Sequence, residues 1–327
     1  MILEWASFLL NRGVDALVFT HLPDYSYRFS GVDMPITYAP AVANQLLRYG
    51  WPRTSHRFLS QRVGAFLRAK DRTKIDLRDD DIIMVPEYAS DFVPDAFPQN
   101  RCVMIAQDVY GLMRVSRQPR FKRNRFSAVI TTSEASSAAA RLILEIEPWQ
   151  IPLVVDPTEF SFVADKKPVI AYLPRKLAED SQLVTSLLAE RGRTQGFEIR
   201  RLAKLTRAEL LRQMHEAAIF LSFSWQEGFG LPPAEAMATG ALVIGYTGVG
   251  GDEYFVSDVG YPIPGSDLSR FVRTVEQVCE QFLADPDSLL PLRKRASERI
   301  LSRYSEERRA DSLMRVFHEI GNNKWVA

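Results

Sequence analysis

The stretch SWQEGFGLPPAEAMATG (224–240) carries two glutamates, Glu227 and Glu235, separated by a glycine-containing turn and a proline pair. It continues the apolar run AAIFLSFS (217–224), which is typical of a buried strand. Two prolines suit the first turn of a helix, where no backbone N–H is needed, and the closing glycine suits a C-terminal cap. The stretch therefore predicts a strand, a glycine turn and a helix in succession.

The glycine turn predicts an anion site. It consists of Gly228, Phe229, Gly230 and Leu231. Backbone amides there lie at the positive end of the predicted helix, and glycine lets the backbone approach a phosphate closely. Glu235, one turn into the helix, reaches the same cleft, and its acceptor oxygens suit a vicinal diol such as ribose. Each glutamate taken alone would equally suit a surface acid or a favourable partner of the helix dipole.

The rest of the chain alternates short apolar runs with helical patterns, which favours two doubly wound α/β domains. The predicted strands cover 15–20, 81–87, 102–108, 127–133, 168–174, 197–203, 217–224 and 241–246. The predicted helices cover 2–11, 134–146, 178–191, 206–216 and the region from 267 onward. A strand, an Asp-Pro turn and a polar stretch over 151–168 suggest a boundary near residue 160. We expect domains over 1–160 and 161–327.

Composition excludes several classes of protein. The 327 residues are 46% hydrophobic and 25% charged with a net charge of +1, so no global field indicates a nucleic-acid partner. The two cysteines, Cys102 and Cys279, lie in apolar surroundings and are expected to be buried thiols of a reducing compartment. Neither a signal peptide nor a membrane-spanning run is found, which predicts a cytoplasmic protein.

Several motifs resemble those of one enzyme family. EGFGLPPAEAMATG (227–240) looks like the E-x7-E signature of retaining GT-B glycosyltransferases of family 4, also called glycosyl transferases group 1. AVITTSEAS (128–136) and IPLVVDPTEF (151–160) resemble the end of the first domain of these enzymes. GYTGVGGDEYF (245–255) resembles their Gly-Gly-x-x-Glu turn, except that Asp252 and Glu253 follow the glycines directly. The resemblance implies the GT-B fold, with two Rossmann-like domains facing a cleft and the final helix (about 305–322) packing back on the first domain.

The resemblance also implies a role for each matching position. Glu235 would bind the ribose of a nucleotide-diphosphate sugar, and Glu227 would contact hydroxyls of the transferred sugar. The amides of Phe229 to Leu231 would hold sugar or phosphate oxygens. Gly250 and Gly251 would belong to the donor site as well.

Relatives place a basic pair after the first strand of the second domain, and YLPRKLAED (172–180) supplies Arg175 and Lys176 there. Fixed cations at this position would stabilise the negative charge that accumulates on the leaving nucleoside diphosphate. The chain departs from the usual pattern because Pro174 replaces a glycine and Lys176 follows at once. The other interpretation of the pair is two solvated charges after a strand.

The first domain would bind the acceptor. Where relatives often carry a histidine, the chain has Gln107 and Asp108. Asp108 either accepts hydrogen bonds from sugar hydroxyls or caps the following turn, and the two interpretations stand equal. His21 follows a predicted strand at the cleft side, although a lone histidine is more often structural. The acidic run 79–81 precedes its strand and is expected to be a solvated turn. Neither a metal site nor a cofactor is predicted.

Basic residues gather in two stretches, one from Arg53 to Lys74 and one over 117–126. Such charges usually form a solvated face; the other interpretation is peripheral contact with an anionic lipid-linked acceptor or the inner face of the membrane.

The start of the chain differs from the family pattern. Relatives begin with a strand and a glycine-rich turn, whereas this chain opens inside the helix that follows them. We therefore expect that the first domain lacks its first strand, and that the protein begins upstream of Met1 or is a truncated form.

The resemblance implies a metal-independent glycosyltransferase that moves a sugar to a glycan or lipid-linked acceptor with retention of configuration. The alternative is a non-catalytic relative that binds nucleotide sugars or serves in a glycan-assembly complex. A Rossmann dehydrogenase is disfavoured because no Gly-x-Gly-x-x-Gly follows an early strand.

Overall fold

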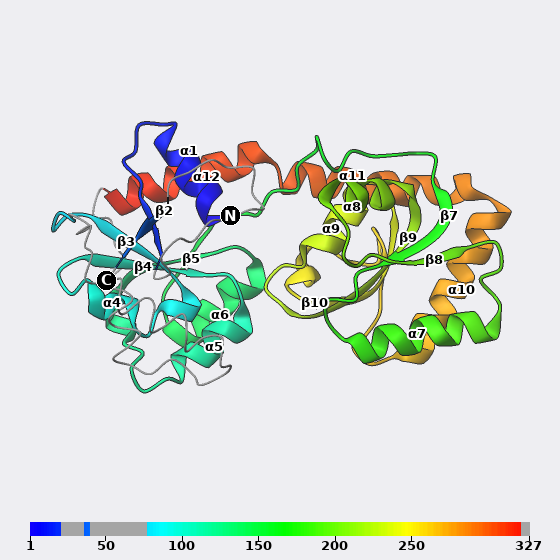
Figure 1. Cartoon of the computed structure of the whole chain (residues 1–327), viewed down its shortest axis with the longest axis horizontal. Helices are drawn as coiled ribbons and strands as arrows, with labels where there is room; N and C mark the ends of the chain where they lie inside the picture. Colours follow the sequence, from blue (N-terminus) through cyan, green and yellow to red (C-terminus); the bar gives the residue numbers. More distant parts are fainter. Residues whose placement is uncertain (21–35, 40–76, 322–327) are drawn as a thin grey trace.

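The computed structural model describes residues 1–20, 36–39 and 77–321, which form two lobes side by side along the long axis of the molecule (Figure 1). The first lobe contains a four-stranded parallel sheet in the order β3-β4-β5-β6. Its strands are β3 (Ile82–Pro86), β4 (Arg101–Ala106), β5 (Phe126–Thr131) and β6 (Trp149–Gln150). Its helices are α1 (Ile2–Leu10), α4 (Val93–Ala96), α5 (Val109–Ser116) and α6 (Glu134–Leu144).

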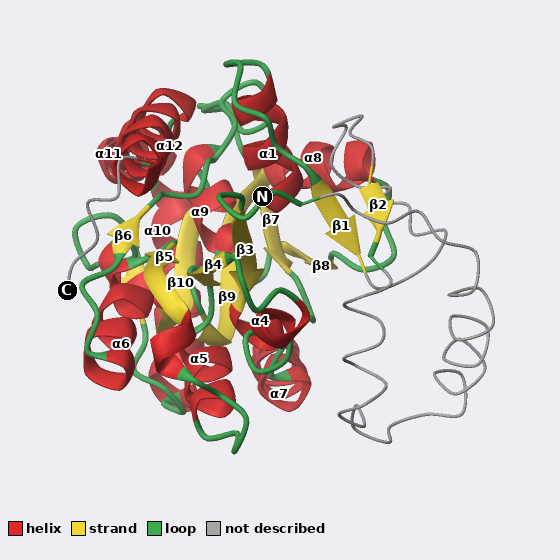
Figure 2. Ribbon diagram, turned by 90° about the vertical axis from the view of Figure 1, so that its left-hand side faces the viewer, coloured by secondary structure: helices red, strands yellow, loops and turns green. Residues whose placement is uncertain are grey.

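The second lobe contains a five-stranded parallel sheet in the order β11-β10-β9-β7-β8. Its strands are β7 (Lys167–Tyr172), β8 (Glu198–Arg201), β9 (Ala217–Glu227), β10 (Leu242–Val249) and β11 (Tyr261–Pro262). Its helices are α7 (Ala178–Arg191), α8 (Arg207–Glu216), α9 (Leu231–Ala238), α10 (Leu268–Ala284) and α11 (Leu290–Arg303). Short 3₁₀ turns are η1 (Glu87–Ala89), η2 (Arg123–Arg125), η3 (Gly250–Glu253) and η4 (Pro286–Leu289). Helices cover both faces of the sheets, as the end-on view shows (Figure 2).

Local signals in the sequence account for most of these elements. Ser133 caps α6, because its side chain accepts from the backbone N–H of Ser136. Thr206 and Glu209 form a capping box at the start of α8. Strands β7, β9 and β10 are apolar on both faces, as expected for parallel strands between helices. The predicted α/β fold with two Rossmann-like units is confirmed.

The chain passes from one lobe to the other twice, and a backbone hydrogen bond joins the two crossing segments. The first crossing begins after Ile151, whose N–H donates to the carbonyl of Thr131 at 2.9 Å. The N–H of Val155 then donates to the carbonyl of Tyr304, at the end of α11. Helix α12 (Glu306–Gly321) returns to the first lobe and packs its Leu313, Val316 and Ile320 into a cluster with Trp5 of α1.

Two strand predictions were wrong in detail. Only Val18–Thr20 (β1) forms a strand within 15–20; it pairs with β2 (Ile36–Tyr38) outside the four-stranded sheet and leaves Leu17 49% exposed. Because β1 lies outside the main sheet, it is not covered on both faces, and the burial expected of a parallel strand is not reached. The strand expected after residue 151 instead occupies Trp149–Gln150. Pro152 has no N–H to continue the ladder, and the next backbone bond goes to Tyr304.

Candidate active site

The motif 224–240 folds as predicted. Strand β9 ends at Glu227, Gly230 is the N-cap of α9 with φ of 86°, and prolines occupy its first turn. A left-handed φ of this size favours glycine, which explains that residue at the cap. At the other end Gly240 donates to the carbonyl of Met237, and Ala241 donates to the carbonyl of Ala236. These two bonds form a Schellman motif, so the predicted glycine cap is confirmed.

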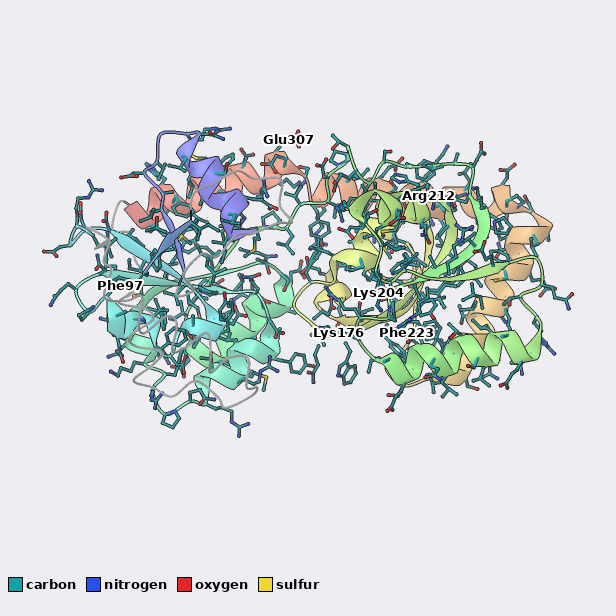
Figure 3. The ribbon with its side chains drawn as sticks, in the orientation of Figure 1. Phe97, Lys176, Lys204, Arg212, Phe223 and Glu307 are labelled. Carbon is teal, nitrogen blue, oxygen red and sulfur yellow. The ribbon has the colours of Figure 1, made fainter. Side chains whose placement is uncertain are left out.

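Three predicted residues meet at the carboxyl ends of β7 and β9. The guanidinium of Arg175 lies 2.6 Å from the carboxylate of Glu227, and the ammonium of Lys176 lies 3.3 Å from it. Lys176 also donates to the carbonyls of Trp225 and Gln226, at 2.9 and 3.2 Å. Because Glu227 is only 8% exposed, its charge needs these cations. Lys176 lies on the part of the second lobe that faces the first lobe (Figure 3).

Arg175 keeps most of its surface open although it pairs with Glu227. Its side chain is 64% exposed, so the donors that do not face Glu227 are accessible to an incoming anion. Arg175, Lys176, Glu227 and the proline pair line a narrow pocket of about 20 Å³, room for about one water molecule. A diphosphate therefore requires the loops around this pocket to separate.

A much larger cleft, of about 630 Å³, lies elsewhere. It is lined by Gln150, Glu253, Arg303 and the face of α12 that carries Arg308 and Arg315. No catalytic residue predicted from the sequence borders it. Chemistry and location, rather than volume, therefore identify the candidate site.

Glu235 lies half-buried one turn into α9, and its carboxylate makes no hydrogen bond or ion pair with any described residue. Burial raises the pKa of its carboxyl to about 7, which the positive charge of Arg207 partly opposes. Arg207 itself forms an ion pair with Glu159. An acceptor group without a partner, beside the amide end of its own helix, is free to bind a ligand hydroxyl.

The glycine turn touches the first lobe. A Cβ on Gly228 would lie 1.6 Å from the carbonyl oxygen of Gln107, at the end of β4. The same carbonyl accepts from the hydroxyl of Ser136 at 3.3 Å, and the N–H of Gln107 donates to Glu87 at 3.2 Å. The two lobes thus meet backbone to backbone at the candidate site, and only glycine fits at residue 228.

Gly250 and Gly251 form a second glycine segment, which lies against the glycine turn. A Cβ on Gly250 would lie 2.2 Å from the carbonyl oxygen of Gly228, whereas one on Gly251 would meet nothing closer than 3.5 Å. The segment continues into Glu253, whose carboxylate accepts from the N–H of Glu134 and from the hydroxyl of Tyr304. Contact of Gly250 and Gly251 with the donor stays a prediction.

In the first lobe Asp108 caps α5, accepting from the N–H groups of Tyr110 and Gly111 at 3.1 and 3.0 Å. Of the two interpretations, the cap is therefore present in the structure, and contact with a sugar stays a prediction. His21 lies outside the described residues, as does the basic stretch from Arg53 to Lys74.

The stretch 117–126 is mainly tied into the first lobe. Arg123 pairs with Glu145 at 2.5 Å, and Arg125 donates to three backbone carbonyls. The acidic run before β3 forms the expected turn, in which Asp81 accepts from Arg78. No described helix is long and apolar enough to cross a membrane. In the same residues no group of three metal-ligating side chains is found.

Two buried residues of the site were missed from the sequence. Glu87, at the end of β3, is 6% exposed, and burial raises the pKa of its carboxyl. Its place at the carboxyl end of a predicted strand was a usable signal. Tyr254 is fully buried beneath the glycine turn, and its hydroxyl donates to the carbonyl of Gly230. Only the fold brings it there.

Comparisons with known proteins agree with this geometry. Residues 175–315 match the model of a family described as glycosyl transferase-like. Over 82 residues the chain is 40% identical to an alpha-1,6-glucosyltransferase of Actinobacillus pleuropneumoniae serotype 7 (strain AP76). The match spans 24% of this chain and 25% of the length of that relative. The matched family region contains every residue predicted to bind the donor.

Solved structures resemble the whole chain. Sucrose-phosphate synthase from Thermosynechococcus elongatus has a TM-score of 0.61 and 17% identity, covering 97% of this chain and 92% of its own. HepE of Anabaena, in complex with UDP and glucose, has a TM-score of 0.61 and 13% identity, covering 98% and 95%. A glycosyltransferase from Rickettsia africae ESF-5 has a TM-score of 0.60 and 11% identity, covering 98% and 94%. The chain has the GT-B fold, and the predicted resemblance to glycosyltransferases is confirmed.

Proposed function

We propose that the chain is a retaining, metal-independent glycosyltransferase that uses a nucleotide-diphosphate sugar. The observation that carries the proposal is the cluster of Arg175, Lys176 and Glu227 beside the amide end of α9. Two fixed cations suit a diphosphate, and a nearby buried carboxylate suits the hydroxyls of the sugar attached to it. Uridine diphosphate glucose is the first donor to test, because HepE was crystallised with UDP and glucose.

In this proposal the ion pair of the free protein changes partners on binding. The diphosphate takes over Arg175 and Lys176, and Glu227 turns to the sugar hydroxyls. This exchange keeps the carboxylate hydrogen-bonded after it loses Arg175. Glu235 then accepts from the ribose hydroxyls, for which its unpaired carboxyl is available.

The cations would act mainly on the leaving group. As the bond from the anomeric carbon to the phosphate oxygen breaks, its electron pair stays on the diphosphate, whose charge Arg175 and Lys176 neutralise. The acceptor hydroxyl attacks the same face of the sugar, and its proton passes to the departing phosphate oxygen. Retention of configuration and a glycan or lipid-linked acceptor are parts of this proposal.

The test is turnover by the purified chain with a panel of nucleotide sugars, measured as released nucleoside diphosphate. We expect release from at least one donor, and roughly a hundredfold lower rate for Glu227→Gln, which keeps the volume but not the charge. Binding is measured separately by calorimetry with the nucleoside diphosphate. Binding without release would favour the alternative of a non-catalytic nucleotide-sugar binder, and absence of both would contradict the proposal.

A further inference from the structure

Tyr254 lies directly beneath the glycine turn of the candidate site. Its side chain is fully buried, and its hydroxyl donates to the carbonyl oxygen of Gly230, the N-cap of α9. Its ring packs against Phe229 at 5.0 Å and against Tyr304 at 5.9 Å between centroids. The phenol is therefore held from the side of the core while its oxygen points at the backbone of the turn.

The surroundings keep this hydroxyl neutral. Burial raises the pKa of Tyr254 well above its ordinary value, and the negative charges of Glu227, Glu253 and Glu235 raise it further. A neutral phenol keeps the proton that it donates to the carbonyl of Gly230.

The bond fixes the orientation of one peptide unit. In a trans peptide the C=O of Gly230 and the N–H of Leu231 point in opposite directions, and no described peptide bond is cis. A carbonyl drawn toward the buried Tyr254 therefore directs the Leu231 N–H away from the core. Within the described part of the chain, this N–H donates to no other residue.

Leu231 carries the only backbone N–H among the first three residues of α9. The first three positions of α9 are Leu231, Pro232 and Pro233, and the two prolines have no N–H. The first turn of this helix thus offers a single free amide, beside that of the N-cap Gly230, whereas an ordinary first turn offers several. An anion placed there depends in part on the direction of the Leu231 amide.

We propose that Tyr254 is a positioning residue, which aims the Leu231 amide at a phosphate or sugar oxygen of the donor through its hydrogen bond to Gly230. The inference rests on the proposed function of the same site. Tyr254 does not touch the donor, since it is fully buried; it acts through the peptide that it orients.

The test removes one oxygen atom, with Tyr254→Phe. The ring keeps its contacts with Phe229 and Tyr304, so the fold is retained, while the Gly230–Leu231 peptide loses the hydrogen bond that holds it from the core side. We expect nucleoside diphosphate binding to weaken and turnover per folded molecule to fall roughly tenfold or more, since small misplacements at a reacting centre are costly. The KM for the acceptor should not change. Tyr246→Phe is the matched control, because it removes another tyrosine hydroxyl bond of the second lobe, a partly buried one to Asp180.

A second variant tests whether Tyr254 acts through the amide of Leu231. Replacing Leu231 by its α-hydroxy acid turns the peptide into an ester that lacks the N–H but keeps the side chain. We expect this ester to reproduce the loss of Tyr254→Phe, and the two changes together to be no worse than either one. An ester with wild-type turnover, or a Tyr254→Phe variant within twofold of wild type in binding and turnover, would overturn the inference. Failure of the wild-type chain itself to bind or release nucleotide would instead reject the proposed function.

Discussion

The substitution Gly228→Ala tests the contact between the lobes at the candidate site. Residue 228 has no left-handed φ, so alanine brings no backbone strain there, and the effect is purely one of space. The added Cβ would lie 1.6 Å from the carbonyl oxygen of Gln107 and 2.7 Å from its carbon. Both partners are backbone atoms at the end of β4, where side-chain rotation offers no relief.

The size of the effect follows from these distances. Ordinary van der Waals contact begins near 3.4 Å, so the turn and Gln107 must separate by about 1.8 Å. A misplacement of about 1 Å at a reacting centre can cost a factor of about 100 in rate. We therefore expect kcat/KM to fall roughly 100-fold or more, equivalent to about 2.7 kcal/mol of transition-state stabilisation. Each lobe keeps its own core, so the melting temperature should change little.

The assay is steady-state release of nucleoside diphosphate, with thermal unfolding measured on the same samples. Gly265→Ala is the control, because a Cβ there would meet nothing closer than 3.9 Å and the residue has no left-handed φ. Wild-type activity in Gly228→Ala would contradict this prediction, because it would mean that the close approach of the two lobes is not needed for turnover.

Three other variants test single groups. Because burial raises the pKa of Glu235 to about 7, from an ordinary value of 4.5, its contribution to stability is complete below pH 4.5 and is lost as the pH rises through 7. In denaturant unfolding, the stability of the wild type should fall from pH 5 to 7.5, and that of Glu235→Gln should fall less. In calorimetry, the affinity for nucleotide should rise as the Glu235 carboxyl ionises, and this rise should occur in the wild type only. Arg175→Ala should lower turnover roughly 100- to 1000-fold and weaken nucleoside diphosphate binding; retention of activity within threefold would remove Arg175 from the mechanism. Half-buried Lys166 donates to the carbonyls of Met214 and His215, so Lys166→Met should cost about 1–3 kcal/mol in unfolding free energy without changing turnover per folded molecule. A change in turnover there would show that the lysine acts on the site.

The motif 224–240 could be interpreted from the sequence because its signals are local. Proline at the first turn, glycine at a left-handed cap and an apolar run before it depend on backbone geometry that neighbouring residues determine. The apolar runs of the parallel strands are equally local, and most of the predicted strands and helices lie where the structure has them. The prediction failed where the position of a strand depends on its pairing partner. An example is β1, which pairs with the short strand β2 and lies outside the main sheet.

The contacts within the site depend on residues far apart in the chain. Arg175 and Glu227 are 52 positions apart, and their ion pair exists because β7 and β9 are neighbours in the sheet. Likewise, the approach of Gly228 to Gln107 depends on how the two lobes meet.

The strand, turn and helix that carry Glu227 and Glu235 follow from their own residues, because hydrogen bonding and φ preferences act over a few residues. The packing of the fold is what pairs Glu227 with Arg175 and Lys176, leaves the Glu235 carboxylate without a partner among the described residues, and places Tyr254 beneath the turn. Burial and charge pairing depend on distance in space, which the order of residues along the chain does not specify.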